Sequence, residues 1–263
     1  IIVSINDVLE GMGGSNMLLM GNSFFRPYAE RFSELALDAD FLEHRDTIVM
    51  RGGVYGTPIG LWTTEDTNTE IKQILDSGNI DILGMTWYFN ENNPLSGFTE
   101  WIDYALQNNP SIKIFVHIPP IDFPADWQQT AEDYGYNNIR DLYGYLVGDL
   151  THKSVIDQLR ELYPSTEIFT LPTGWATFDL VDQYENNLLL DDISLFGSYD
   201  DSIFRDTKGH QGKIVVNTGA LIWLNGLYGV NLRTNDSDTG FNTDLHTIAE
   251  NIMDLHDPDY KQQ

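Results

Sequence analysis

The stretch MLLMGNSFFRP, residues 17–27, decides the fold of this 263-residue chain. Its apolar run Met17–Met20 stops abruptly at Gly21, as a strand buried on both faces does where a turn follows. Asn22 and Ser23 come next, ahead of the helical pattern in YAERFSELALDA. The stretch therefore predicts a strand, a tight turn and a helix, with a serine on the turn.

The same alternation of strand and helix continues along the chain. Four further near-continuous apolar runs predict buried strands: TIVM (47–50), DILGMTW (81–87), IKIFVHI (112–118) and EIFTLP (167–172). Amphipathic or apolar stretches predict helices over 28–39, 67–78, 97–109, 152–164, 213–229 and 244–255. Strands that alternate with helices form parallel sheets through right-handed crossovers. We therefore predict an α/β fold, a three-layer α/β/α sandwich around a parallel five-stranded sheet.

Composition limits the partners of the chain. It carries 40 acidic and 14 basic residues, which give a formal net charge of −26 at pH 7. Nucleic acid and anionic lipid would be repelled, so we expect neither as a partner. The apolar runs are shorter than the ~18 residues that a membrane span needs, so none is expected. The absence of cysteine excludes disulfides, zinc–thiolate sites and cysteine nucleophiles.

Ser23 lies where functional residues gather in parallel α/β folds, just past the end of a strand. There its hydroxyl could attack a carbonyl while nearby backbone N–H groups stabilise the oxyanion. The alternative is that Ser23 only caps the following helix. A nucleophilic serine needs a base, and the candidate is His210 in IFRDTKGHQGKIVV, with Asp206 four residues earlier to hold its imidazole. The alternative for His210 is an exposed loop histidine.

GNSF after the first strand, with an Asp…His pair ahead of a large helix late in the chain, resembles the SGNH (GDSL-like) hydrolase superfamily. The resemblance extends from about Met17 to Gly229. The stretch from DSIFRDTKGHQG to LNGLYG, residues 201–229, is similar to a poorly characterised branch of that superfamily. It implies a flavodoxin-like α/β/α fold and a serine esterase that needs neither a metal nor an organic cofactor. It also implies that Ser23 is the nucleophile, His210 the base and Asp206 the orienting acid.

The resemblance further implies an oxyanion hole built from three segments. The N–H group of Ser23 supplies the first donor. RGGVYG after the second strand offers Gly52 and Gly53, of which we choose Gly53. The third block, a Gly-x-Asn-Asp pattern in the family, is degenerate here and places Asn90 at the amide position, with Asn92 as the second choice.

The last block departs from the family pattern. Members carry the aspartate three residues before the histidine, but here that residue is Thr207 and Asp206 stands four before His210. Three arrangements stay open: Asp206 orients His210 with Gly209 absorbing the extra residue, another acid such as Asp201 does so, or a Ser–His dyad works alone. We favour the first.

Four more residues are predicted to bind substrate: Arg26, Trp87, Tyr88 and His117. Arg26, about one helical turn after Ser23, could bind a carboxylate or sulfate, or instead pair with a surface acid. The two aromatic residues could stack on a sugar ring or hold an acyl chain, or simply pack loops. His117 ends the fourth strand, where it could line the pocket or serve as a second candidate base; a structural histidine is the alternative.

These features together predict a carbohydrate O-acyl (acetyl) esterase that takes a small-molecule or carbohydrate ester. A non-catalytic carbohydrate-binding protein and an acyltransferase are the alternatives. We expect one domain over 1–263, with a leader or edge segment at 1–16 and an acidic C-terminal helix and tail at 234–263. The chain begins with IIVSIN rather than Met, and we expect it to be secreted or periplasmic, with the cytoplasm as the alternative. The oligomeric state stays open.

Overall fold

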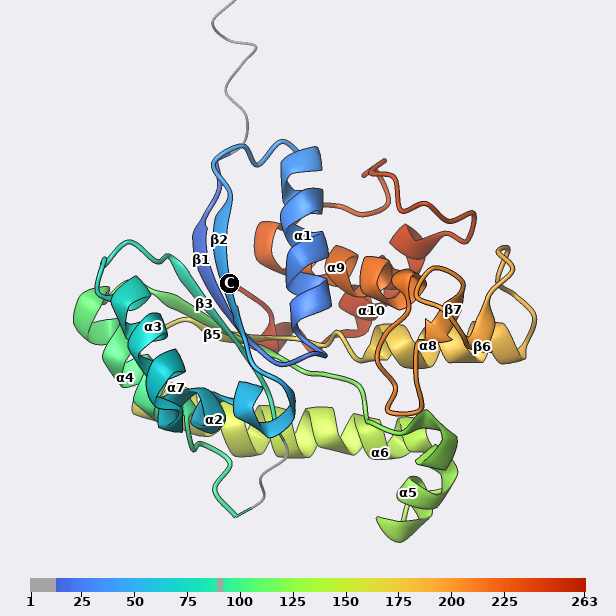
Figure 1. Ribbon diagram of the computed structural model, residues 1–263, viewed down its shortest axis with the longest axis horizontal. Helices are drawn as coiled ribbons and strands as arrows, with labels where there is room; N and C mark the ends of the chain where they lie inside the picture. Colours follow the sequence, from blue (N-terminus) through green and yellow to red (C-terminus); the bar gives the residue numbers. More distant parts are fainter. Residues whose placement is uncertain (1–12, 89–91) are drawn as a thin grey trace, which may run out of the picture.

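The structure is a computed structural model that describes residues 13–88 and 92–263 (Figure 1). Its centre is a parallel five-stranded sheet in the order β2-β1-β3-β4-β5. The strands are β1 (Asn16–Gly21), β2 (Arg45–Met50), β3 (Ile82–Thr86), β4 (Lys113–His117) and β5 (Ile168–Leu171). Each overlaps one of the five predicted apolar runs, so the predicted α/β fold with a parallel sheet is confirmed.

Helices cover both faces of the sheet and complete the three layers (Figure 1). One layer contains α1 (Arg26–Asp38), α8 (Trp175–Glu185), α9 (Lys213–Tyr228) and α10 (Leu245–Leu255). The other contains α2 (Pro58–Thr63), α3 (Glu65–Leu75), α4 (Phe98–Asn108) and α7 (Asp157–Leu162). Because side chains of a strand alternate between its faces, Met17 and Leu19 join the first core while Leu18 and Met20 join the second. Both faces of β1 are therefore buried, which is why Met17–Met20 are all apolar.

A long helical segment next to β5 differs from the predicted helix over 152–164. It consists of α6 (Ile139–Tyr145), a π-helix (Leu146–Ile156) and α7 without a break. Side-chain hydrogen bonds also span five residues in the π-helix, since the hydroxyls of Thr151 and Ser154 each donate to the backbone carbonyl five residues earlier. An i→i+5 repeat moves apolar residues off the α-helical period, so the pattern hid the first half of this segment.

Several short elements were not predicted. They are α2, α5 (Trp127–Asp133), α6, α8, the strands β6 (Ser194–Phe196) and β7 (Ser202–Phe204), and 3₁₀ turns at Gly53–Gly56, Pro124–Asp126 and Pro258–Tyr260. Most of the predicted leader segment lies outside the described residues, and α10 is the helix expected near the C-terminus. Among the helices of residues 13–88 and 92–263, none is long and apolar enough to cross a membrane.

The parallel sheet brings the ends of four strands to one edge. The Arg51 N–H donates to the Gly21 carbonyl at 3.1 Å, and the Trp87 N–H donates to the His117 carbonyl at 2.8 Å. These bonds tie the segments that follow β1, β2, β3 and β4 side by side. Residues far apart in sequence therefore meet at this edge, as the topology requires.

Candidate active site

The turn after β1 presents Ser23 without using its hydroxyl as a helix cap. The N-cap residue of α1 is Phe25, and no side chain caps that helix. The backbone carbonyl of Asn22 accepts the N–H groups of Phe25 and Arg26 at 3.1 and 3.0 Å, and its side-chain oxygen accepts the Phe24 N–H at 2.9 Å. Asn22 thus satisfies the start of the helix, and the helix-cap interpretation of Ser23 is wrong.

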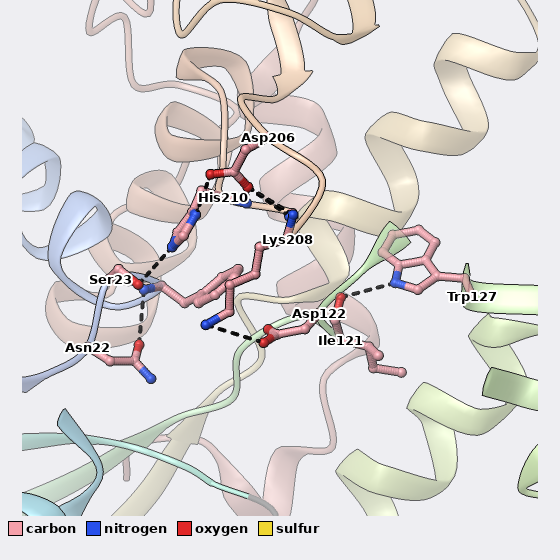
Figure 2. A network of polar contacts seen from close by, with 10 residues as sticks. Asn22, Ser23, Ile121, Asp122, Trp127, Asp206, Lys208 and His210 are labelled. Atoms are coloured by element: carbon pink, nitrogen blue, oxygen red, sulfur yellow. Dashed lines mark hydrogen bonds and ion pairs between the residues drawn. The ribbon is translucent and has the colours of Figure 1, made fainter. Parts of the chain in front are cut away.

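Ser23 and His210 meet across 187 residues of sequence. The serine Oγ lies 2.8 Å from His210 Nε2, within hydrogen-bond distance (Figure 2). The ring of Phe24 stacks on the imidazole with centroids 4.8 Å apart and planes at 18°. The imidazole is therefore held on two sides, by a hydrogen bond and by an aromatic face.

Asp206 completes a chain of three side chains. Its Oδ2 lies 2.6 Å from His210 Nδ1, while Oδ1 accepts the N–H groups of Lys208, Gly209 and His210 at 3.1, 3.1 and 3.2 Å. Gly209 adopts a φ of +95°, which a glycine reaches without strain. One carboxylate therefore closes the turn and faces the imidazole, and this turn accommodates the four-residue spacing from Asp206 to His210.

The other candidate acid is engaged elsewhere. Asp201 accepts hydrogen bonds from the N–H and hydroxyl of Ser198 at 3.0 and 2.6 Å, within the loop between β6 and β7. Among the three arrangements that the sequence left open, the geometry matches the one with Asp206.

Electrostatics favours an ionised Asp206. Burial raises its pKa, but the hydrogen bonds from the His210 side chain and from the turn N–H groups lower it more, so the pKa lies below its ordinary value. An ionised carboxylate at Nδ1 requires the proton to be on that nitrogen. Nε2 then faces Ser23 as an acceptor, which is the tautomer a general base needs.

Two backbone N–H groups near Ser23 are available for an oxyanion. Neither the Ser23 nor the Gly53 N–H donates to any acceptor in the part of the chain that the structure describes. The 3₁₀ turn that begins at Gly53 packs directly on the serine turn, because a Cβ on Gly56 would lie 2.5 Å from the Gly21 carbonyl oxygen. The predicted amide donor Asn90 lies outside the described residues, and Asn92 is exposed.

A cleft of about 370 Å³ opens beside the serine turn. Its walls come from the segments after β1, β2, β3 and β4 and from the His210 turn. They are formed by Asn22, Phe24, Gly53, Val54, Trp87, Tyr88, Pro119, Pro120, Ile121, Asp122 and Lys208. The predicted substrate-binding residues Trp87 and Tyr88 both lie in this wall, the first buried and the second 46% exposed.

Arg26 does not reach the cleft. Its guanidinium donates to Glu30 one turn further along α1 at 2.6 Å, and both side chains are half exposed. It is not among the residues that line the cleft. The structure therefore matches the surface salt bridge that was the alternative for this residue.

His117 is a structural histidine, so its predicted places in the pocket wall and as a second base are wrong. It has no exposed surface, lies 3.1 Å from the Thr86 hydroxyl and packs against the rings of Phe25 and Trp223. Burial lowers its pKa from 6.5 to about 3, so it stays neutral in the folded protein.

His117 should make the protein less stable in acid. Below about pH 6.5 the unfolded chain binds a proton at this residue, while the folded chain does not until about pH 3, so stability falls as pH falls between these values. Between pH 6.5 and 4.5 the loss should be about 2 kcal/mol from this group. Urea unfolding of wild type and His117→Phe at both pH values measures it. Equal losses in the two proteins would show that His117 does not contribute.

Two residues of the cleft were missed in the sequence. Lys208 stands two residues before His210 in the same turn, and Asp122 follows the end of β4. The available signals were their positions, Lys208 in the turn that carries His210 and Asp122 past the end of a strand. The sequence supplied no sign that the two would face each other.

Comparisons with known proteins add a distant likeness to a solved structure. The sequence matches no protein-family model and no curated protein. A solved structure, the periplasmic domain of a lipopolysaccharide acetyltransferase from Salmonella ser. Paratyphi A, is similar over 63% of this chain and 68% of that chain. The two share 12% identity with a TM-score of 0.37. A likeness this weak assigns no activity, so a function must be inferred from the site itself.

Proposed function

We propose that the protein is a serine esterase of the SGNH type. The observation that supports this most is the unbroken chain from Asp206 through His210 to Ser23, with links of 2.6 and 2.8 Å. It stands at the edge of a parallel sheet, where such folds place their sites. A purely binding protein on the same fold would give no reason for this chain of side chains.

The proposed reaction passes through an acyl-enzyme. Ser23 Oγ attacks the ester carbonyl while His210 Nε2 takes its proton, and the charge on the new oxyanion is stabilised by the N–H groups of Ser23 and Gly53. The tetrahedral species collapses, and His210 returns the proton to the leaving alcohol. Water then attacks the acyl-serine while His210 takes one of its protons, and His210 returns that proton to Ser23 Oγ as the acyl–oxygen bond breaks and the acid leaves. Asp206 stays ionised and holds the imidazolium.

Carbohydrate O-acyl groups are the proposed substrates. The half-exposed ring of Tyr88 offers a surface on which a sugar ring can stack, and the buried Trp87 beside it forms part of the cleft wall. The cleft of about 370 Å³ is large enough for one ring with a small acyl group and too small for a long lipid. A glycan without charge also avoids repulsion from a protein with a net charge of −26.

A fluorophosphonate probe and a set of acetyl esters test the proposal. We expect covalent labelling of one serine, Ser23, and release of acetate from p-nitrophenyl acetate and from O-acetylated xylan. Analysis of the products in the presence of a free sugar separates hydrolysis from transfer, since a transferase would move acetyl to the sugar. Absence of both labelling and acetate release would refute the proposal.

A further inference from the structure

Lys208 and Asp122 face each other in the cleft, below the Ser23–His210 pair in Figure 2. The Lys208 Nζ lies 3.8 Å from the Asp122 carboxylate, and the two side chains are 38% and 42% exposed. The ammonium also lies 5.7 Å from the centre of the Phe24 ring. They are the ionisable acid and base among the described residues of the cleft wall.

The backbone holds this pair in place. The Phe123 N–H donates to the Lys208 carbonyl at 2.9 Å. Figure 2 shows a second bond, in which the Trp127 indole N–H donates to the Ile121 carbonyl at 3.0 Å. Phe123 has a φ of +55°, which is costly for a bulky side chain and persists only where its surroundings impose it. The segment that carries Asp122 is thus fixed to the catalytic turn.

The pair is too loose to satisfy itself. At 3.8 Å the two groups exceed ordinary hydrogen-bond length, so the ammonium keeps free donors and the carboxylate keeps free acceptor sites toward the cleft. An anionic ligand would be repelled by Asp122, and a cationic ligand would be repelled by Lys208. Hydroxyl groups, which both donate and accept, suit a neighbouring donor and acceptor of opposite charge.

We propose that Lys208 and Asp122 form a subsite for two neighbouring hydroxyl groups of an uncharged sugar whose ester lies at Ser23. The inference rests on the proposed esterase function and specifies its substrate. One hydroxyl accepts from the Lys208 ammonium and the next donates to Asp122. Esters without such a hydroxyl pair gain nothing from this subsite.

Substrate pairs test the subsite through ratios of kcat/KM. The substrates are monoacetylated methyl glucoside, which keeps free neighbouring hydroxyls, and p-nitrophenyl acetate, which has none. Lys208→Met and Asp122→Asn should each lower the ratio of the first to the second about tenfold, because the first removes a charged donor and the second replaces a charged acceptor by a weaker neutral one. The ratio also cancels effects on the shared catalytic chain.

Lys213→Met is the matched control. Lys213 pairs with Asp200 at the same 3.8 Å and is similarly exposed, but it lies at the start of α9 and outside the cleft. We expect it to leave the ratio unchanged. Thermal unfolding of all three variants verifies that they fold. An unchanged ratio in folded Lys208→Met and Asp122→Asn overturns the subsite while Ser23-dependent hydrolysis of p-nitrophenyl acetate still supports the esterase.

Binding measured without catalysis separates the two proposals further. Monoacetylated methyl glucoside is titrated into two proteins, the Ser23→Ala variant and the double variant Ser23→Ala/Asp122→Asn, and binding is followed by NMR. Affinity that drops about tenfold with Asp122→Asn supports the subsite even when the esterase proposal fails; equal affinity overturns it. An acetylated glucuronide that binds more tightly than the glucoside, with the preference lost in Lys208→Met, would overturn the neutral-sugar assignment in favour of an anion site.

Discussion

Replacing Ser23 by alanine should lower kcat for ester hydrolysis on the order of 10⁴-fold or more, because no covalent intermediate can form. The hydroxyl makes no structural cap in α1, and its hydrogen bond is to His210 at 2.8 Å. Stability should therefore change little. Acetate release and fluorophosphonate labelling measure the loss, and thermal unfolding verifies the fold.

Ser33→Ala is the control for this experiment. Ser33 lies in α1, ten residues after Ser23, and its hydroxyl donates to the Ala29 carbonyl at 3.0 Å and contacts Asp46. The Ser33→Ala variant should keep wild-type esterase activity and wild-type labelling by the fluorophosphonate. Ser23→Ala protein that still hydrolyses p-nitrophenyl acetate at the wild-type rate would exclude Ser23 as the nucleophile.

Asp206→Asn should lower kcat by about 10³- to 10⁴-fold while leaving the turn closed. The asparagine oxygen can still accept the N–H groups of Lys208, Gly209 and His210. Its amide N–H₂, however, would face Nδ1 as a donor and move the imidazole proton to Nε2. The base would then point a proton at Ser23 instead of a lone pair.

Asp201→Asn is the matched control, because that carboxylate binds Ser198 and not His210. It should retain wild-type kcat. Steady-state kinetics with p-nitrophenyl acetate and the unfolding temperature are the two readouts. A loss below about tenfold in Asp206→Asn, with an unchanged unfolding temperature, would mean that Ser23 and His210 work as a dyad.

The sheet could be predicted because its chemistry is local. A strand buried on both faces must be apolar at nearly every position, and Met17–Met20 or Ile82–Thr86 satisfy this over a few residues. The order of strands and helices then left few topologies open. The same approach failed for the long helix beside β5, because its π-helical repeat removes the 3.6-residue hydrophobic period on which helix prediction depends.

The site was predictable only as far as sequence neighbours determine it. Ser23, His210 and Asp206 follow from a turn, two glycines and a carboxylate close to the histidine. Arg26 follows the same rule, because its guanidinium pairs with Glu30 one helical turn along the chain, which is the alternative that the sequence offered for it. The burial of His117 under Trp223 depends on α9 packing over β4, which no local pattern reveals.

The order of the proposed catalytic residues along the chain has a consequence for biosynthesis. The proposed nucleophile Ser23 belongs to the first β–α unit, whereas its proposed base His210 comes 187 residues later, just ahead of α9. α9 docks on α1 through contacts such as the Arg31 guanidinium to the Asn217 side chain at 2.8 Å. A nascent chain on the ribosome therefore carries an inert serine until α9 has been synthesised and has docked. Enzymatic turnover, on the proposed function, would then report that late docking step rather than the earlier formation of the sheet.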